Sequence, residues 1–178
     1  GYIKKTVSGD VMNIKKVSVD KEGTGMGWGA VYAQYLESMD QIGEQGNGLS
    51  VSRQLYKGDE ALNESAPLKV GDRITVRLTV KADRDMDFVQ IKDDRAACME
   101  PLQAVSGFRW SNGLGYYQAT KDASTQFFID QMRKGTYVIE YQVYVNRTGE
   151  YQAGIATVQS AYAPEFGGHT GGYRVMVE

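Results

Sequence analysis

Alternation of apolar and polar positions is the strongest pattern in this chain. In residues 137–145 the odd positions are all apolar or aromatic, whereas the even positions are mixed. Residues 74–80 show the same period of two, with aliphatic side chains at the even positions and threonine or arginine at the odd ones. This period is typical of a β-strand that buries one face. Both segments are therefore predicted to be strands that line a hydrophobic core.

Turn residues separate these strands from shorter ones and indicate how they connect. Gly149 allows a tight return from residues 134–146 into a strand at 151–158, and Asn112-Gly113 is a typical hairpin turn. Further short strands are predicted at residues 11–20, 49–56, 88–91, 108–110, 116–119, 124–129 and 173–177. Short strands joined by turns at this spacing predict an all-β fold, an antiparallel two-sheet β-sandwich.

Residues 30–42 fit two patterns. Val31, Tyr35, Leu36 and Met39 belong to a stripe with helical spacing, whereas Val31, Ala33 and Tyr35 also alternate as in a strand. Periodicity leaves helix and strand open here. The glycine-rich, polar residues 43–48 that follow are a natural boundary between two parts of the chain.

Composition narrows the possible functions. The 178 residues are 42% hydrophobic and 11% aromatic, enough for a packed core, and the net charge of −2 offers no surface that would neutralise nucleic-acid phosphates. Cys98 is the single cysteine, so an internal disulfide is impossible. The sequence has no apolar run of membrane-spanning length, and no membrane contact by this chain is expected. It starts with Gly1 rather than Met, so the natural protein is expected to be longer.

Two motifs imitate ligand sites. Residues 25–30 (GMGWGA) match a dinucleotide-binding fingerprint, but that site requires βαβ units, which the sequence does not predict, so a glycine-rich loop is the better interpretation. Asp83, Asp85, Asp87 and Asp94 imitate part of a calcium loop. Phe88 stands where that loop needs glycine, and its twelfth position needs a bidentate glutamate, so a solvated turn is favoured.

Single reactive residues also lack the partners that catalysis needs. His169 lies in a GGHTGG segment without an adjacent nucleophile motif, and Cys98 is better interpreted as a small buried thiol. Asp93-Asp94-Arg95 could hold a local ion pair. Twelve tyrosines in a β-sandwich raise the possibility of carbohydrate binding, although their strand positions favour core packing. No catalytic, cofactor-binding or metal-binding residue is predicted, and no cofactor.

Several segments together resemble a known family. They are residues 28–35 (WGAVYAQY), 48–53 (GLSVSR), 68–76 (LKVGDRITV), 89–101 (VQIKDDRAACMEP), 121–125 (KDAST), 127–129 (FFI), 134–146 and 149–166 (GEYQAGIATVQSAYAPEF). In order and spacing they resemble the C-terminal portion of a bacterial alpha-2-macroglobulin-family protein. The resemblance spans about residues 11–178.

This resemblance implies two domains. Residues 1–47 would be the returning strands of the CUB-like domain that flanks the thioester domain, with residues 30–37 as a strand. Residues 48–178 would be the terminal macroglobulin-like (immunoglobulin-like) sandwich, which corresponds to the receptor-binding domain of animal relatives. Residues 42–45 (IGEQ) imitate the family's Cys-Gly-Glu-Gln thioester motif, but Ile42 supplies no thiol, so the match is interpreted as chance.

The family traps proteases, so the resemblance implies a non-catalytic module of an envelope-associated protease inhibitor. Its partners would be the neighbouring macroglobulin-like and thioester domains of the same chain, and target proteases through the full-length protein. Its location would be the periplasm or cell envelope. The alternative is a cell-surface glycan-binding or adhesion module, which would need several exposed aromatic side chains in a row. A small hydrolase built on His169 ranks third.

Overall fold

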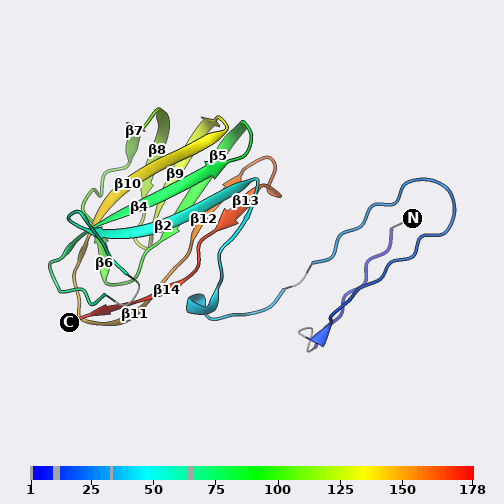
Figure 1. Cartoon of the computed structure of the whole chain (residues 1–178), viewed down its shortest axis with the longest axis horizontal. Helices are drawn as coiled ribbons and strands as arrows, with labels where there is room; N and C mark the ends of the chain where they lie inside the picture. Colours follow the sequence, from blue (N-terminus) through cyan, green and yellow to red (C-terminus); the bar gives the residue numbers. More distant parts are fainter. Residues whose placement is uncertain (1, 10–12, 33, 64–65) are drawn as a thin grey trace. The chain divides into compact units, whose positions relative to one another are not determined.

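The computed structural model describes residues 2–9, 13–32, 34–63 and 66–178 (Figure 1). The chain divides into two compact units, Gly1–Leu36 and Glu37–Glu178. The described residues of the first unit contain no strand, and all strands belong to the second unit. No helix among the described residues has the length and apolar character that crossing a bilayer requires.

The first regular element of the second unit is a short 3-10 helix, η2 (Met39–Gln41), and the regular elements that follow it among the described residues are all strands. The strands are β1 (Gln45–Asn47), β2 (Leu49–Lys57), β3 (Glu60–Ala61), β4 (Arg73–Ala82), β5 (Met86–Asp94), β6 (Met99–Pro101), β7 (Gly107–Ser111), β8 (Leu114–Thr120), β9 (Ser124–Met132), β10 (Gly135–Val145), β11 (Gly149–Ala153), β12 (Ala156–Ser160), β13 (Gly167–His169) and β14 (Tyr173–Val177).

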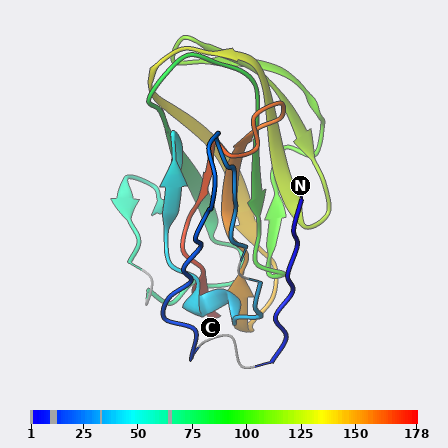
Figure 2. The same ribbon diagram turned by 90° about the vertical axis from the view of Figure 1, so that its right-hand side faces the viewer.

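The strands form two layers that are joined at one side. One layer has the order β6-β10-β4-β2, the other β12-β5-β9-β8-β7, and the short strands β1 and β13 link β2 to β12. β3 pairs with β2, and β11 pairs with β14 in a separate two-stranded sheet. Figure 1 shows β10, β4 and β2 side by side, and in Figure 2 the strands of this unit run mostly along the vertical. Every named pair is antiparallel. The predicted all-β antiparallel sandwich is therefore confirmed.

The core lies between the layers, where the alternation placed it. Ile139, Tyr141, Val143 and Val145 of β10 are buried, and so are the even positions of β4 from 74 to 80. The Phe127 and Tyr141 rings meet across the layers with their centroids 5.9 Å apart. Burying apolar side chains from both inner faces is the main stabilising contribution in such a sandwich.

Two local predictions about pairing have opposite outcomes. The hairpin at Asn112-Gly113 is confirmed, since both residues have positive φ (50° and 79°) and join β7 to β8. The predicted hairpin between residues 134–146 and 151–158 is wrong. β10 pairs with β4 and β6, whereas residues 149–160 divide into β11, which pairs with β14, and β12, which pairs with β5 and β13. The division occurs beside Gly154, where an added Cβ would lie 2.4 Å from the Asp94 Cβ.

The strands predicted at 11–20 and 30–37 are wrong for their described residues, because no neighbouring described segment pairs with them. Residues 11, 12 and 33 lie outside the described residues. The helical alternative at 30–42 is limited to η2. The assignment of residues 1–47 to a CUB-like domain stays a prediction, as does the domain boundary at residue 47.

Candidate functional site

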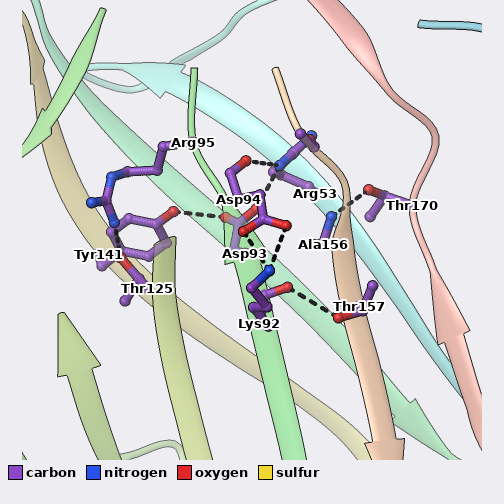
Figure 3. A network of polar contacts seen from close by, with 11 residues as sticks. Arg53, Lys92, Asp93, Asp94, Arg95, Thr125, Tyr141, Ala156, Thr157 and Thr170 are labelled. Atoms are coloured by element: carbon purple, nitrogen blue, oxygen red, sulfur yellow. Dashed lines mark hydrogen bonds and ion pairs between the residues drawn. The ribbon is translucent and has the colours of Figure 1, made fainter. Parts of the chain in front are cut away.

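A buried ion pair joins the two layers of the sandwich (Figure 3). Arg53 extends from the inner face of β2, and its Nη1 donates to Asp93 Oδ1 on β5 over 2.5 Å. The Arg53 side chain is 5% exposed and the Asp93 side chain 1% exposed. A buried charge pair is stable only when further hydrogen bonds satisfy the remaining polar atoms. The surrounding side chains and carbonyl groups supply these bonds.

Asp93 and Arg53 each have additional partners from other parts of the sandwich. Tyr141 of β10 donates its hydroxyl proton to Asp93 Oδ2 over 2.7 Å. Arg53 also donates to the carbonyl oxygens of Gly154 (2.6 Å) and Asp94 (3.3 Å), and its guanidinium carbon lies 4.6 Å from the centre of the Tyr173 ring. The network therefore ties together β2, β5, β10, β14 and the turn between β11 and β12.

The network shifts the pKa values of Arg53, Tyr141 and Tyr173. Burial alone lowers the pKa of Arg53, but the opposite charge and hydrogen bond of Asp93 outweigh it and raise that pKa. Burial, together with the nearby Asp93 charge, raises the pKa of Tyr141 well above its ordinary value. Burial also raises the pKa of Tyr173 to about 12, against the opposing effect of the Arg53 charge. Both tyrosines therefore stay neutral, and Arg53 stays charged, at physiological pH.

A cavity of about 380 Å³ lies beside this network, and Arg53 and Tyr173 form part of its lining. Leu55, Leu62 and Leu68 contribute apolar surface, and Glu44 contributes a carboxylate. Among the described residues, the lining includes Ser52 but neither cysteine nor histidine. No hydrogen bond within the described part of the chain joins Ser52 to a general base, so the lining lacks an activated nucleophile there. Its chemistry is that of a structural ion pair next to a mixed polar and apolar cavity.

The structure separates the residues that the sequence singled out as possible ligands. Asp83 pairs with Arg84, Asp85 accepts a hydrogen bond from the Lys134 backbone, and Asp94 pairs with Lys92. No cluster of three His, Cys, Asp or Glu side chains suited to a metal occurs among the described residues. Residues 25–30 lie in a segment to which no strand or helix is assigned. Asp83, Asp85 and Asp94 each have a different partner, so they do not converge on one calcium site.

Neither His169 nor Cys98 is among the hydrogen-bond partners that the described residues give to Arg53 and Asp93. His169 is in β13, half-buried, with Nδ1 3.1 Å from the Thr170 carbonyl oxygen. Cys98 is fully buried, and burial raises the pKa of its thiol, as expected for an inert core cysteine. In the thioester-like stretch, the Ile42 carbonyl accepts from the Gly172 backbone and Gln45 belongs to β1. His169, Cys98, Ile42 and Gln45 therefore all belong to the sandwich or are hydrogen-bonded to it.

Sequence reasoning missed the ion pair, although a signal for it was present. Arg53 alternates with Leu49 and Val51, and Asp93 alternates with Val89 and Ile91, so each charge occupies a core-facing position. Opposite charges at two such positions indicate a buried pair. The predicted local pair within residues 93–95 is wrong, because Asp93 binds Arg53 and Arg95 donates to Thr125 and to the carbonyl groups of Lys121 and Asp122.

Comparison with known proteins places this fold in context. A family model described as Bacterial Alpha-2-macroglobulin MG10 domain matches residues 48–165. Native alpha-2-macroglobulin from Escherichia coli, spanning domain MG7 to the C-terminus, is similar in structure with a TM-score of 0.64 and 17% identity, over 76% of this chain and 24% of that one. Escherichia coli alpha-2-macroglobulin activated by porcine elastase gives a TM-score of 0.66 at 16% identity, over 77% of this chain and 14% of that one.

Two further relatives are also much longer than this chain. A Salmonella alpha-2-macroglobulin mutant gives a TM-score of 0.63 at 20% identity, over 76% of this chain and 10% of that one. Circularly permutated Ras protein 2 of Dictyostelium discoideum is 27% identical over 166 residues, which are 89% of this chain and 4% of that protein. The chain therefore spans a small part of each of these relatives.

Proposed function

This chain belongs to the bacterial alpha-2-macroglobulin family, and we propose that it acts as a non-catalytic module that packs against neighbouring domains of a longer protein. The observation that carries the proposal is the match of the MG10 domain model to residues 48–165. The resemblance found in the sequence is thereby confirmed. The architecture supports the module role, since the buried charges are used to join the two layers of the sandwich.

For the longer protein we infer protease trapping outside the cytoplasm. One similar Escherichia coli structure is described as activated by porcine elastase and another as activated by trypsin. The partners proposed for this chain are the neighbouring macroglobulin-like and thioester domains, with target proteases bound only through the longer protein. The proposed location is the periplasm or cell envelope.

The module role predicts that the isolated 178-residue chain has no inhibitory activity. The chain is mixed in excess with trypsin or elastase, and hydrolysis of a small chromogenic substrate and of casein is followed. We expect unchanged rates with both substrates and no protease adduct that survives denaturing electrophoresis. Inhibition by the isolated chain, or a covalent adduct with it, would contradict the module role.

The gene provides an independent test. If the longer protein traps proteases, we expect the coding sequence upstream of this chain to contain a bait segment and a thioester domain. An upstream sequence that encodes unrelated domains would contradict protease trapping while leaving the family assignment of residues 48–165 intact.

A further inference from the structure

The solvent-facing side of the β12-β5-β9-β8-β7 layer carries an ordered row of aromatic and amide side chains. Cross-strand register places Phe108 opposite Tyr117, Tyr117 opposite Phe128, Phe128 opposite Gln90, and Gln90 opposite Gln159. Phe108 is 80% exposed and Phe128 40% exposed, and both glutamines are exposed. The row therefore crosses five strands on the face that points away from the core.

A second row runs parallel to the first and is entirely polar. Gln126 lies opposite Lys92, Lys92 opposite Thr157, Thr157 opposite His169, and His169 opposite Gln45. Its members are half-buried or exposed. In the central strands the neighbours of these positions along each strand, such as Val89, Ile91 and Phe127, are buried. Both rows therefore lie on the other side of the sheet and form one surface, called here the outer face.

One end of the outer face is hollowed. A groove of about 430 Å³ is lined by Gln45, Thr157, Gln159 and His169 from the two rows, together with Asn47 and Glu165. The backbone in the groove is close-packed, because Gly46, Gly167 and Gly168 have no room for a side chain. The Asn47 side chain donates to the Glu165 carbonyl and the Gln159 side chain to the Pro164 carbonyl, which holds one wall in place.

The chemistry of the two rows selects one class of ligand, and we propose that the outer face binds a neutral oligosaccharide. Sugar hydroxyl groups both donate and accept hydrogen bonds, and the side-chain amides of Gln45, Gln90, Gln126 and Gln159 do the same. The C–H faces of sugar rings pack on aromatic rings, which Phe108, Tyr117 and Phe128 supply at the other end.

Charge and length refine the ligand class. Lys92 is the one formally charged side chain among the ten in the two rows, and it already pairs with Asp94 at 2.9 Å. The face therefore offers little attraction to an anionic polymer. With neighbouring strands about 4.8 Å apart, the first row extends roughly 19 Å, which suits a chain of several sugars rather than a single one. The inference is independent of protease trapping, because a domain of a trap can also bind a glycan.

The test is a titration of the isotope-labelled 178-residue chain, followed by the NMR signals of its glutamine side-chain amides. The probes are maltohexaose, cellohexaose and chitohexaose, each with its disaccharide, added to about 10 mM so that a Kd of about 1 mM is detected. We expect at least one hexasaccharide to shift the signals of Gln90 and Gln159, and to bind more tightly than its disaccharide. Absence of binding by all three hexasaccharides would overturn the proposal.

Two matched variants locate the site. Phe108→Ala removes an exposed ring of the first row and is expected to weaken hexasaccharide binding about tenfold. Tyr162→Ala removes a ring that is equally exposed, at 80%, but lies outside both rows, and is expected to leave binding unchanged. Equal effects of the two variants would overturn the assignment to the outer face. A different outcome would also overturn it: the chain self-associates, and Phe108→Ala abolishes this self-association without changing sugar binding. The outer face would then be a protein interface.

Discussion

Arg53 and Asp93 differ in their surroundings from an ion pair on the surface of the same sheet. Their side chains are 5% and 1% exposed, whereas those of Arg77 and Glu140, which lie opposite each other on β4 and β10, are 41% and 44% exposed. Water screens the second pair but not the first, so the same chemical contact has different consequences. Losing one member of the buried pair leaves the other charge without a partner in the core.

Replacing Arg53 tests this difference. Arg53→Met keeps much of the side-chain volume but leaves the Asp93 carboxylate buried without its counterion, and we expect the free energy of unfolding to fall by about 3–5 kcal/mol. Arg77→Met is the matched control, and we expect it to leave the free energy of unfolding nearly unchanged, because water screens the exposed Arg77–Glu140 pair. Urea unfolding followed by circular dichroism measures both. Equal losses in the two variants would show that the buried pair has no special role.

Because Tyr173 is partly buried against Arg53, we expect the folded chain to lose stability at alkaline pH. The pKa of Tyr173 is raised by burial to about 12 in the folded chain, against an ordinary value of 10.0. A raised pKa contributes stability that is complete below pH 10 and is lost as the pH rises toward 12, because the unfolded chain releases the proton first.

Tyr173→Phe removes this titration, so its free energy of unfolding should fall less between pH 10 and 12 than that of the unchanged chain. Tyr144→Phe, at a tyrosine that is 38% exposed, is the control and should retain the full pH dependence. Urea unfolding at several pH values gives the slopes. Identical slopes for all three proteins would contradict a contribution from Tyr173.

For single residues, the sequence predicted which side of a strand a side chain occupies better than it predicted which residue that side chain contacts. Alternation placed Arg53 on the same side as Leu49 and Val51, and the side chain does point into the core. The partner could not be predicted in this way, because Asp93 lies 40 residues away on the other layer and the pairing depends on how the layers stack.

Among the elements, β1 and β13 have a role that exceeds their length of three residues each. They join β2 of one layer to β12 of the other. Their central residues, Gly46 and Gly168, lie opposite each other. A Cβ added to Gly168 would lie 2.7 Å from the Leu49 carbonyl oxygen and 2.8 Å from that of Gln45. The junction of the layers thus depends on a backbone contact that a side chain would prevent.

Gly168→Ala is expected to lower the free energy of unfolding by about 1–3 kcal/mol, since the backbone of β1 or β2 must move to admit the methyl group. Gly43→Ala is the matched control, because nothing lies within 4 Å of its added Cβ and its φ is not positive. It should leave stability nearly unchanged. Thermal unfolding of both variants measures the difference, and a Gly168→Ala variant as stable as the control would contradict the close approach.

The elements also show where prediction from sequence ends. The long strands β4 and β10 were predicted because each presents a full apolar face. The strands β1 and β13 were missed, since three-residue strands rich in glycine carry no periodic signal. The connection after β10 was mispredicted as a hairpin because a glycine permits a tight return without requiring one, and β11 and β12 instead pair with β14 and β5.

At the scale of the whole molecule, two boundaries compete. The sequence and its family resemblance place a domain boundary at residue 47, whereas the second compact unit starts at Glu37. The difference concerns residues 37–47, which hold η2 and β1. Within the second unit β1 pairs with β13 at three positions and meets β2 at Asn47 and Leu49, and the Ile42 carbonyl accepts a hydrogen bond from Gly172.

Two truncated chains decide which boundary the folded unit follows. Residues 37–178 contain all the strands described, and we expect this fragment to unfold cooperatively, with the same core as the full chain. Residues 48–178 lack β1, so one edge of β13 loses its partner and the strand that connects β2 to β13 is missing. With a net contribution of about 0.5–1.5 kcal/mol per hydrogen bond, we expect this fragment to be less stable by about 2–4 kcal/mol. Urea unfolding of the two fragments measures the difference. Equal stability would mean that residues 37–47 add nothing to the sandwich, and the folded unit would then start at residue 48, as the family resemblance predicted.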